Sequence, residues 1–217
     1  MSARNGQPMP PPSCIPGIPT FSGTLIIVGA AKRAMDDLRK ARALRRGAHI
    51  MLINEAAGLE EDANHLLAGH TEKADLFVGY RFRKFQHAPL PHTEGGPLVH
   101  AKTWEKSEPY PKYITHLWRN VACGASSAWV GVRIGKAMGY SEIILAGCPM
   151  DDSGYFNEPE TGQFKHACAR LGHGERYGNN RMYHNYRASF KRHAEREGQN
   201  VYSMSGYSQQ LLGAPPC

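Results

Sequence analysis

Residues 123–156 read CGASSAWVGVRIGKAMGYSEIILAGCPMDDSGYF, and this stretch decides the fold. Two serines precede an apolar segment of helical length, and a short isoleucine-containing run follows, ending in Gly147. Serine is a preferred residue at the start of a helix, and a short apolar run bounded by turn residues is typical of a buried strand. The stretch therefore predicts a helix over 126–139 and a buried strand over 141–147.

The same pair of signals occurs near the start of the chain. Residues 24–30, TLIIVGA, form a β-branched run that ends in glycine, as a buried parallel strand does. The next segment, 31–47, places small and apolar side chains on one helical stripe, with arginine and lysine elsewhere. The stripe consists of Ala34, Leu38 and either Ala41 or Leu44. These two segments predict one strand–helix unit.

Further segments continue this alternation. We expect a strand over 48–54, a short helix over 60–69, a strand over 74–80, a basic amphipathic helix over 180–198 and a last strand over 199–205. Strands separated by helices favour a mainly parallel sheet with covering helices. The predicted fold class is α/β, a single-domain Rossmann-like fold with a mainly parallel sheet and helices on both faces.

Length and composition favour one compact domain. The chain has 217 residues, of which 41% are hydrophobic and 21% charged, as in an ordinary globular protein. No apolar run approaches the roughly 18 residues of a membrane span. Residues 1–20 are rich in proline and lack the apolar core of a signal peptide, so we expect a flexible leader, a single nucleotide-binding domain over 21–217 and a cytoplasmic location.

The net charge indicates which binding partners are favoured, and the cysteine pattern indicates whether disulfides or a zinc site are expected. The formal net charge is +7, which favours a polyanionic partner such as nucleic acid, an anionic glycan or a nucleotide. The five cysteines include no C-x-x-C pair, which argues against a disulfide framework and a ribbon-type zinc site. Reduced thiols are the simplest interpretation.

Candidate binding residues follow the predicted strands. In an open parallel sheet, ligands bind beyond the carboxyl ends of the strands, where helix N-termini present free N–H groups. The residues at such ends are Gly29, Ala30, Lys32, Asn54, Ser126, Ser127 and Gly147. The segment VGAAKR contains a single glycine, so it is neither the dinucleotide fingerprint nor a P-loop. Ser126 or Ser127 can cap the following helix, face an anion, or do both.

Two groups of residues raise the question of a metal. Asp151 and Asp152 can bind a divalent cation such as Mg²⁺ through their carboxylates, although a solvated turn is equally natural for DDSG. The spacing of His166, Cys168 and His173 fits no strong zinc template. A magnesium ion at Asp151 and Asp152 therefore stays possible, whereas a zinc site is disfavoured.

The central stretch resembles a segment of the bacterial sialyltransferases of glycosyltransferase family 42 and of the related MptE-like domains. The shared pattern is a serine turn (Ser126, Ser127), an apolar helix ending in a Gly-Tyr pair, and the strand EIILAG, which closes near Asp151. The resemblance covers about thirty residues, with weaker echoes along the chain. It implies a nucleotide-sugar donor, cytidine monophosphate carrying sialic acid, and chemistry that needs no metal.

The resemblance also implies roles for single residues. Asn54, Ser126, Ser127 and Gly147 would contact the nucleotide. The catalytic candidates are His184 as the general base, Tyr155 as the holder of the leaving phosphate, and Asp151. A histidine suits the first role because it titrates near neutral pH. Tyr177 and Tyr183 compete with Tyr155 as phosphate ligands.

Basic and aromatic residues alternate over 81–104, and positive charge continues along the last helix. Such interleaving suits phosphates and stacked bases, although solvated loop charge explains it too. The acceptor is not identified by the sequence; the candidates are a glycan and, if the basic segment binds phosphates, a nucleic acid, including a modified DNA base of the kind phages use. The competing functions are an MptE-like pyrophosphokinase or other nucleotide-phosphate enzyme and a non-catalytic nucleic-acid-binding module.

Overall fold

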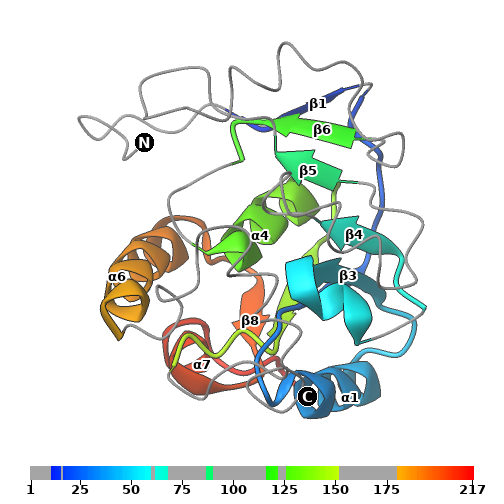
Figure 1. Cartoon of the computed structure of the whole chain (residues 1–217). Helices are drawn as coiled ribbons and strands as arrows, with labels where there is room; N and C mark the ends of the chain where they lie inside the picture. Colours follow the sequence, from blue (N-terminus) through cyan, green and yellow to red (C-terminus); the bar gives the residue numbers. More distant parts are fainter. Residues whose placement is uncertain are drawn as a thin grey trace.

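The protein contains a long, mainly parallel sheet (Figure 1). The computed structural model describes residues 11–15, 17–59, 62–67, 87–89, 116–121, 126–151 and 180–217. Within these ranges the strands follow the order β1-β6-β5-β4-β3-β2-β7-β8. Each adjacent pair is parallel except β1 and β6. The strands are β1 (Ser13–Ile15), β2 (Thr24–Val28), β3 (His49–Ile53), β4 (His65–Leu67), β5 (His87–Pro89), β6 (His116–Arg119), β7 (Glu142–Ala146) and β8 (Val201–Ser203).

The central strand β2 is buried on both faces. It pairs with β3 on one side and β7 on the other. Successive side chains of a strand point to opposite faces. Leu25 and Ile27 accordingly enter one hydrophobic cluster, and Ile26 and Val28 enter the other. This burial confirms the prediction from TLIIVGA, because only a strand covered on both faces favours an unbroken apolar run.

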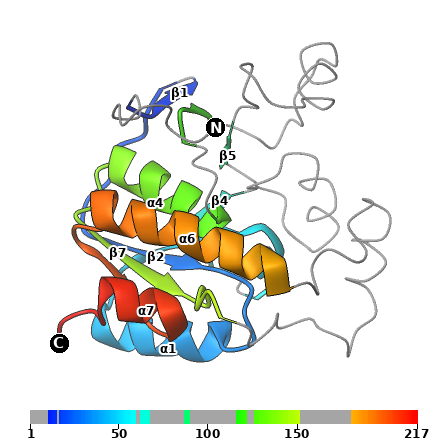
Figure 2. The ribbon, with the colours of Figure 1, turned by 90° about the vertical axis from the view of Figure 1, so that its left-hand side faces the viewer.

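Helices cover the two faces of the sheet (Figure 2). Helix α1 (Ala34–Leu44) lies on one face and buries Ala34, Leu38 and Ala41. Leu44 is 37% exposed, so Ala41 completes the predicted stripe. Helices α4 (Ser127–Ala137) and α6 (Asn180–Glu197) lie on the other face. The predicted α/β class with helices on both faces is confirmed.

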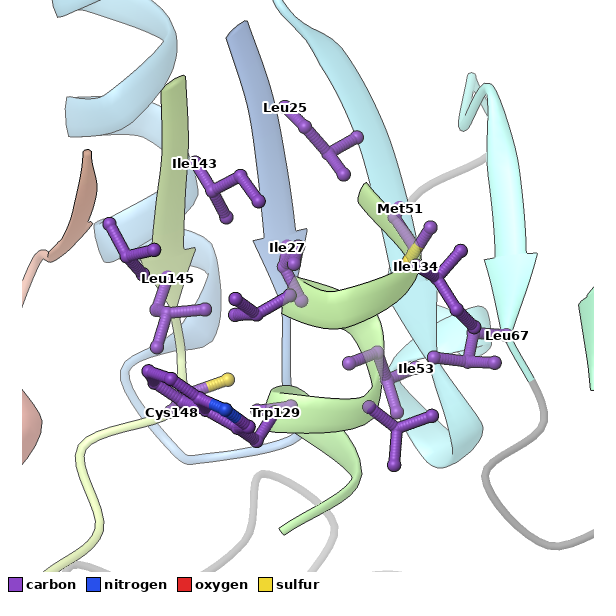
Figure 3. Packing of buried hydrophobic residues seen from close by; sticks show 14 of the residues in the cluster. Leu25, Ile27, Met51, Ile53, Leu67, Trp129, Ile134, Ile143, Leu145 and Cys148 are labelled. Atoms are coloured by element: carbon purple, nitrogen blue, oxygen red, sulfur yellow. The ribbon is translucent and has the colours of Figure 1, made fainter. Parts of the chain in front are cut away.

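Helix α4 packs closely on the centre of the sheet. A Cβ on its Gly135 would lie 2.7 Å from Leu25 Cδ2, so glycine lets the helix approach the sheet without displacing that side chain. Ile134 and Trp129 join the cluster formed by β2, β3 and β7 (Figure 3). The first turn of α4 therefore rests at the carboxyl ends of these strands, beside Cys148.

Some elements differ from the sequence predictions. The expected helix over 60–69 is wrong: its centre forms β4, which pairs in parallel with β3 through Met51 and His65. Neither strand β5 nor helix α7 (Gly206–Leu212) was among the elements predicted from the sequence. Strand β1 lies inside the expected leader and pairs with β6. The predicted strand over 74–80 lies outside the described residues.

The amino edge of the central strands is filled by an aromatic cluster. The Tyr140 hydroxyl lies 2.5 Å from His49 Nδ1 and 2.7 Å from His65 Nε2. Phe21 stacks on the Tyr140 ring with centroids 5.5 Å apart. Burial raises the pKa of Tyr140, so the phenol stays protonated. This edge is occupied by packed rings, whereas the loops with the predicted site residues lie at the opposite, carboxyl edge.

No helix in the described part of the chain combines the length and apolar character that a membrane span requires.

Candidate functional site

The site lies where the chain order reverses. From β2 the sheet continues through β3 on one side and through β7 on the other. Such a switch point opens a crevice at the carboxyl ends of the two diverging strands, and ligands of open α/β sheets bind there. The loops after β2, β3 and β7 meet at this edge and carry most of the predicted site residues.

The loops after β2 and β7 pack backbone against backbone. Gly29 N donates to Ala146 O at 2.9 Å, and Ala31 N donates to Gly147 O at 3.2 Å. A Cβ on Gly29 would lie 2.5 Å from Cys148 Sγ and 2.6 Å from Gly147 O. The two glycines are therefore required for close packing of the loops. Their contact with a nucleotide stays a prediction.

A buried carboxylate holds the start of the β7 loop. Gly147 has φ +60°, a left-handed conformation that favours glycine, and its N–H donates to Asp37 Oδ2 at 3.0 Å. The same oxygen accepts a 2.5 Å hydrogen bond from Ser205 Oγ. Asp37 is 3% exposed. Sequence analysis missed it because an acidic residue in the first turn of a helix has an ordinary explanation in the helix dipole.

The next three residues of this loop, 148–150, each accept a hydrogen bond at the backbone carbonyl. Ser208 binds two successive carbonyls, with Oγ donating to Cys148 O at 2.7 Å and N donating to Pro149 O at 3.2 Å. Arg187 Nε donates to Met150 O at 2.6 Å. Met150 has φ +54°, a strained conformation for this residue type. An irregular loop held at each carbonyl is preorganised, as a binding site requires.

Asn54 and Ser127 meet across the top of the sheet. Asn54 follows β3 with φ +51°, another left-handed residue that is not glycine. Its Nδ2 donates to Ser127 Oγ at 3.3 Å. Two residues predicted from separate motifs to contact the nucleotide are thus neighbours. Strained backbone of this kind clusters at functional sites.

The start of α4 suits an anion better than the start of α1 does. Ser126 occupies the N-cap position as predicted, but its hydroxyl makes no capping bond. That hydroxyl oxygen is buried and has no hydrogen-bond partner among the described residues. The first turn of α4 contains no acidic residue, whereas α1 has Asp36 and Asp37 there. Because helix N-termini attract negative charge, an additional anion is favoured at α4 and repelled at α1.

The residues predicted after β2 have mixed surroundings. Ala30 is buried and Lys32 is exposed. Arg33 Nη2 lies 3.8 Å from Asp151 Oδ2, with the Asp151 side chain 20% exposed. Asp151 therefore faces a guanidinium. Its partner Asp152 and the residues His166, Cys168 and His173 lie outside the described part, and the described residues contain no cluster of three metal-ligating side chains.

The Cys148 thiol is a packing group. Its sulfur donates to Ala146 O at 3.4 Å. Burial raises the pKa of the Cys148 thiol to about 12, so the thiol stays protonated at neutral pH. A protonated, buried thiol is a poor nucleophile.

Helix α6 carries the predicted base, His184, and contacts this edge through Arg187. The helix begins at Asn180, as predicted, so His184 lies in its second turn. Arg187, three residues later, binds the β7 loop through Met150 O. The side chain of His184 lies outside the described part of the chain, as do Tyr155, Tyr177 and the basic segment over 81–104 apart from β5.

Similarity to known proteins is found in the three-dimensional fold and not in the amino-acid sequence. No family model matches the chain, and no curated protein matches it. The fold is similar to that of a tyrosine-to-phenylalanine variant of the sialyltransferase CST-II in complex with CMP. The TM-score is 0.57 and the identity 12%, over 88% of this chain and 86% of that chain.

Two further structures agree. The sialyltransferase CST-II in complex with trisaccharide acceptor and CMP has a TM-score of 0.56 and 12% identity, over 89% of this chain and 86% of that chain. CstII from Campylobacter jejuni in complex with cytidine-5'-monophosphate has a TM-score of 0.53 and 12% identity, over 91% of this chain and 86% of that chain. The chain therefore has a sialyltransferase-like α/β fold. The predicted resemblance is confirmed at the level of the fold.

Proposed function

We propose that this protein is a nucleotide-sugar-dependent glycosyltransferase of the family 42 type, with a donor sugar activated by cytidine monophosphate. The observation that supports it most is the likeness of its fold to that of a sialyltransferase in complex with CMP, over 88% of the chain. Since fold alone does not define function, the argument also requires a suitable site. The carboxyl edge of the sheet offers one.

The nucleotide binds between the loop after β3, the start of α4 and the loop after β7. Asn54 and Ser127 are already in contact at 3.3 Å, so a ribose or base seated there meets both polar side chains. The buried hydroxyl of Ser126, which has no partner among the described residues, supplies a further hydrogen-bond group. The dipole of α4 favours the negative phosphate near these residues.

The reaction is an inverting transfer. The acceptor hydroxyl oxygen attacks the anomeric carbon of the donor sugar and forms the new glycosidic bond. The bond from that carbon to the phosphate oxygen breaks, and its electron pair leaves with cytidine monophosphate. His184 takes the proton of the acceptor hydroxyl as general base, and Tyr155 donates a hydrogen bond to the leaving phosphate.

The acceptor is a hydroxyl-bearing glycan. One neighbour of similar fold was solved with a trisaccharide acceptor and CMP. The net charge of +7 suits an acceptor or donor that carries negative groups. A glycosylated or modified DNA base is an alternative acceptor with the same hydroxyl chemistry.

The proposal is tested by ligand binding and transfer. A thermal-shift series with CMP, UMP, GMP and CMP-activated sugars should show the largest rise in melting temperature with the cytidine ligands, because a ligand that binds only the folded state stabilises it. Ser127→Ala should lose much of this shift. Ser141→Ala is the matched control, since its hydroxyl binds Gly23 O at 3.1 Å at the opposite edge.

His184→Asn should retain CMP binding and lose sugar transfer, as a missing general base requires. Lys191→Ala, an exposed change on the same helix, should retain both. Unchanged transfer by both Ser127→Ala and His184→Asn would exclude the proposal. Magnesium-dependent consumption of a nucleoside triphosphate would favour the nucleotide-phosphate enzyme. Salt-sensitive nucleic-acid binding without transfer would favour the binding module.

A further inference from the structure

Arg187 makes two contacts with its neighbours and leaves most of its hydrogen-bond donors unused. Its Nε donates to Met150 O at 2.6 Å, and its Cζ lies 5.0 Å from the centroid of the Tyr207 ring. A guanidinium has five N–H donors in a fixed plane, of which this arrangement uses one. The two Nη groups make no hydrogen bond with any residue that the structure describes.

The positive charge of Arg187 has no carboxylate partner among the described residues. The carboxylates of the neighbouring elements are engaged elsewhere. Asp151 lies 3.8 Å from Arg33, and Glu195 lies 3.9 Å from Lys191. Glu197 lies 3.5 Å from Arg133, near the far end of α6. Because burial disfavours an unpaired charge, a bound anion would stabilise a half-buried guanidinium that pairs with none of the described carboxylates.

The position of Arg187 places it at the candidate site. Met150 belongs to the loop that follows β7 at the carboxyl edge, and Tyr207 lies in the first turn of α7, just after β8. Arg187 follows His184 by three residues in α6, which is about one helical turn. Figure 2 shows α6 on the side of the sheet opposite α1.

We propose that Arg187 is an oxyanion-binding residue of this site, with its two Nη groups donating to two oxygens of one substrate group. The planar fork of arginine matches phosphate and carboxylate oxygens, and the contact with the Tyr207 ring restricts where the guanidinium lies. The oxyanion is the phosphate of the nucleotide or the carboxylate of an acidic donor sugar. This inference rests on the proposed function, because it assigns a residue to the same substrate.

Arg187→Gln and Arg192→Gln form a matched pair of variants. Both remove one positive charge from α6 with the same substitution, and Arg192 is exposed. Calorimetry with cytidine, CMP and CMP-N-acetylneuraminic acid separates the contributions of the nucleoside, the phosphate and the sugar carboxylate. Arg187→Lys retains the charge but loses the planar fork, so its affinity for CMP should lie between those of the native protein and Arg187→Gln.

The expected result is that Arg187→Gln weakens CMP binding by about 10- to 100-fold, as for a lost hydrogen bond to a charged group, and leaves cytidine binding unchanged. Weakening confined to the CMP-activated sugar would assign the carboxylate as the ligand and still support the proposal. Equal loss of cytidine binding, or no loss at all, would overturn it while the proposed function stands. A native protein that binds none of the three ligands would exclude the proposed function itself, and this inference with it.

Discussion

The Nδ2 of Asn54 donates a 3.3 Å hydrogen bond to Ser127 Oγ, which joins residues 73 positions apart in the chain. Asn54 follows β3 and Ser127 begins α4, so the bond links a strand end to a helix start at the carboxyl edge of the sheet. The left-handed backbone of Asn54 makes the geometry possible. This pair is the part of the candidate site that the structure defines most directly.

Asn54→Gly should separate stability from binding at this pair. Glycine adopts φ +51° without strain but loses the hydrogen bond to Ser127, so the variant should be only about 1 kcal/mol less stable than the native protein. The lost amide should weaken CMP binding by about fivefold, the value of one ordinary hydrogen bond. Thermal melting and calorimetry measure the two effects. Unchanged CMP affinity would show that the Asn54 amide makes no contact with the nucleotide.

Gly29→Ala should destabilise the junction of the β2 and β7 loops. Its Cβ would lie 2.5 Å from Cys148 Sγ and 2.6 Å from Gly147 O, which forces backbone to move. We expect a loss of about 1–3 kcal/mol in the free energy of unfolding, as for overpacking in a dense core. Gly17→Ala is the control, because nothing lies within 4 Å of its added Cβ. Urea denaturation compares the two variants, and equal stabilities would refute the packing role of Gly29.

Asp37→Ala should cost far more stability than Asp36→Ala. Both changes remove one acid from the first turn of α1, so the loss of helix-dipole stabilisation is matched. Asp37 accepts hydrogen bonds from Gly147 N and Ser205 Oγ, and its removal leaves two buried donors unsatisfied. We expect about 3 kcal/mol for Asp37→Ala. The exposed Asp36 pairs with Arg39, at 2.9 Å, so its loss should cost about 0.5 kcal/mol or less. Chemical denaturation measures both, and similar values would contradict the assignment.

Glu142 should make stability depend on pH in the acidic range. Its hydrogen bonds from Arg45 hold the pKa of the carboxyl below its ordinary value, although partial burial opposes this. A lowered pKa stabilises the fold above the unfolded value of about 4.3, and this stabilisation is lost as pH falls through the folded pKa. Glu142→Gln should therefore be about 0.5–1 kcal/mol less stable than the native protein at pH 7. The difference should vanish at acidic pH. Denaturation at pH 7 and at about pH 3 checks this, and a difference independent of pH would be contrary to it.

The strands and helices of the central layer were predictable because each carries a local pattern. The run over 24–28 is apolar on both faces, and Ala34, Leu38 and Ala41 repeat at helical spacing. The helix expected over 60–69 was wrong because its apolar run is too short to distinguish the two periods. Residues 65–67 form a strand because they pair with β3. Strand β5 has only three residues and its sequence contains no strand pattern of its own.

The candidate site was predictable only where a residue follows a strand or begins a helix. Asn54, Ser126, Ser127 and Gly147 satisfy that rule, since chain order alone places them at the carboxyl edge. Asp37 and Arg187 do not, because each lies inside an amphipathic helix whose acidic and basic residues resemble an ordinary solvated face. Their roles depend on partners 110 and 37 residues away.

Local periodicity by itself determined that this chain alternates buried strands with amphipathic helices, because burial of apolar side chains at a period of two or 3.6 residues needs no knowledge of the partner. Only the tertiary structure decided which loops touch. The Asn54–Ser127 bond, the Asp37–Gly147 bond and the Arg187–Met150 bond each join distant segments, and no local pattern encodes a hydrogen bond whose donor and acceptor meet only after the sheet has formed.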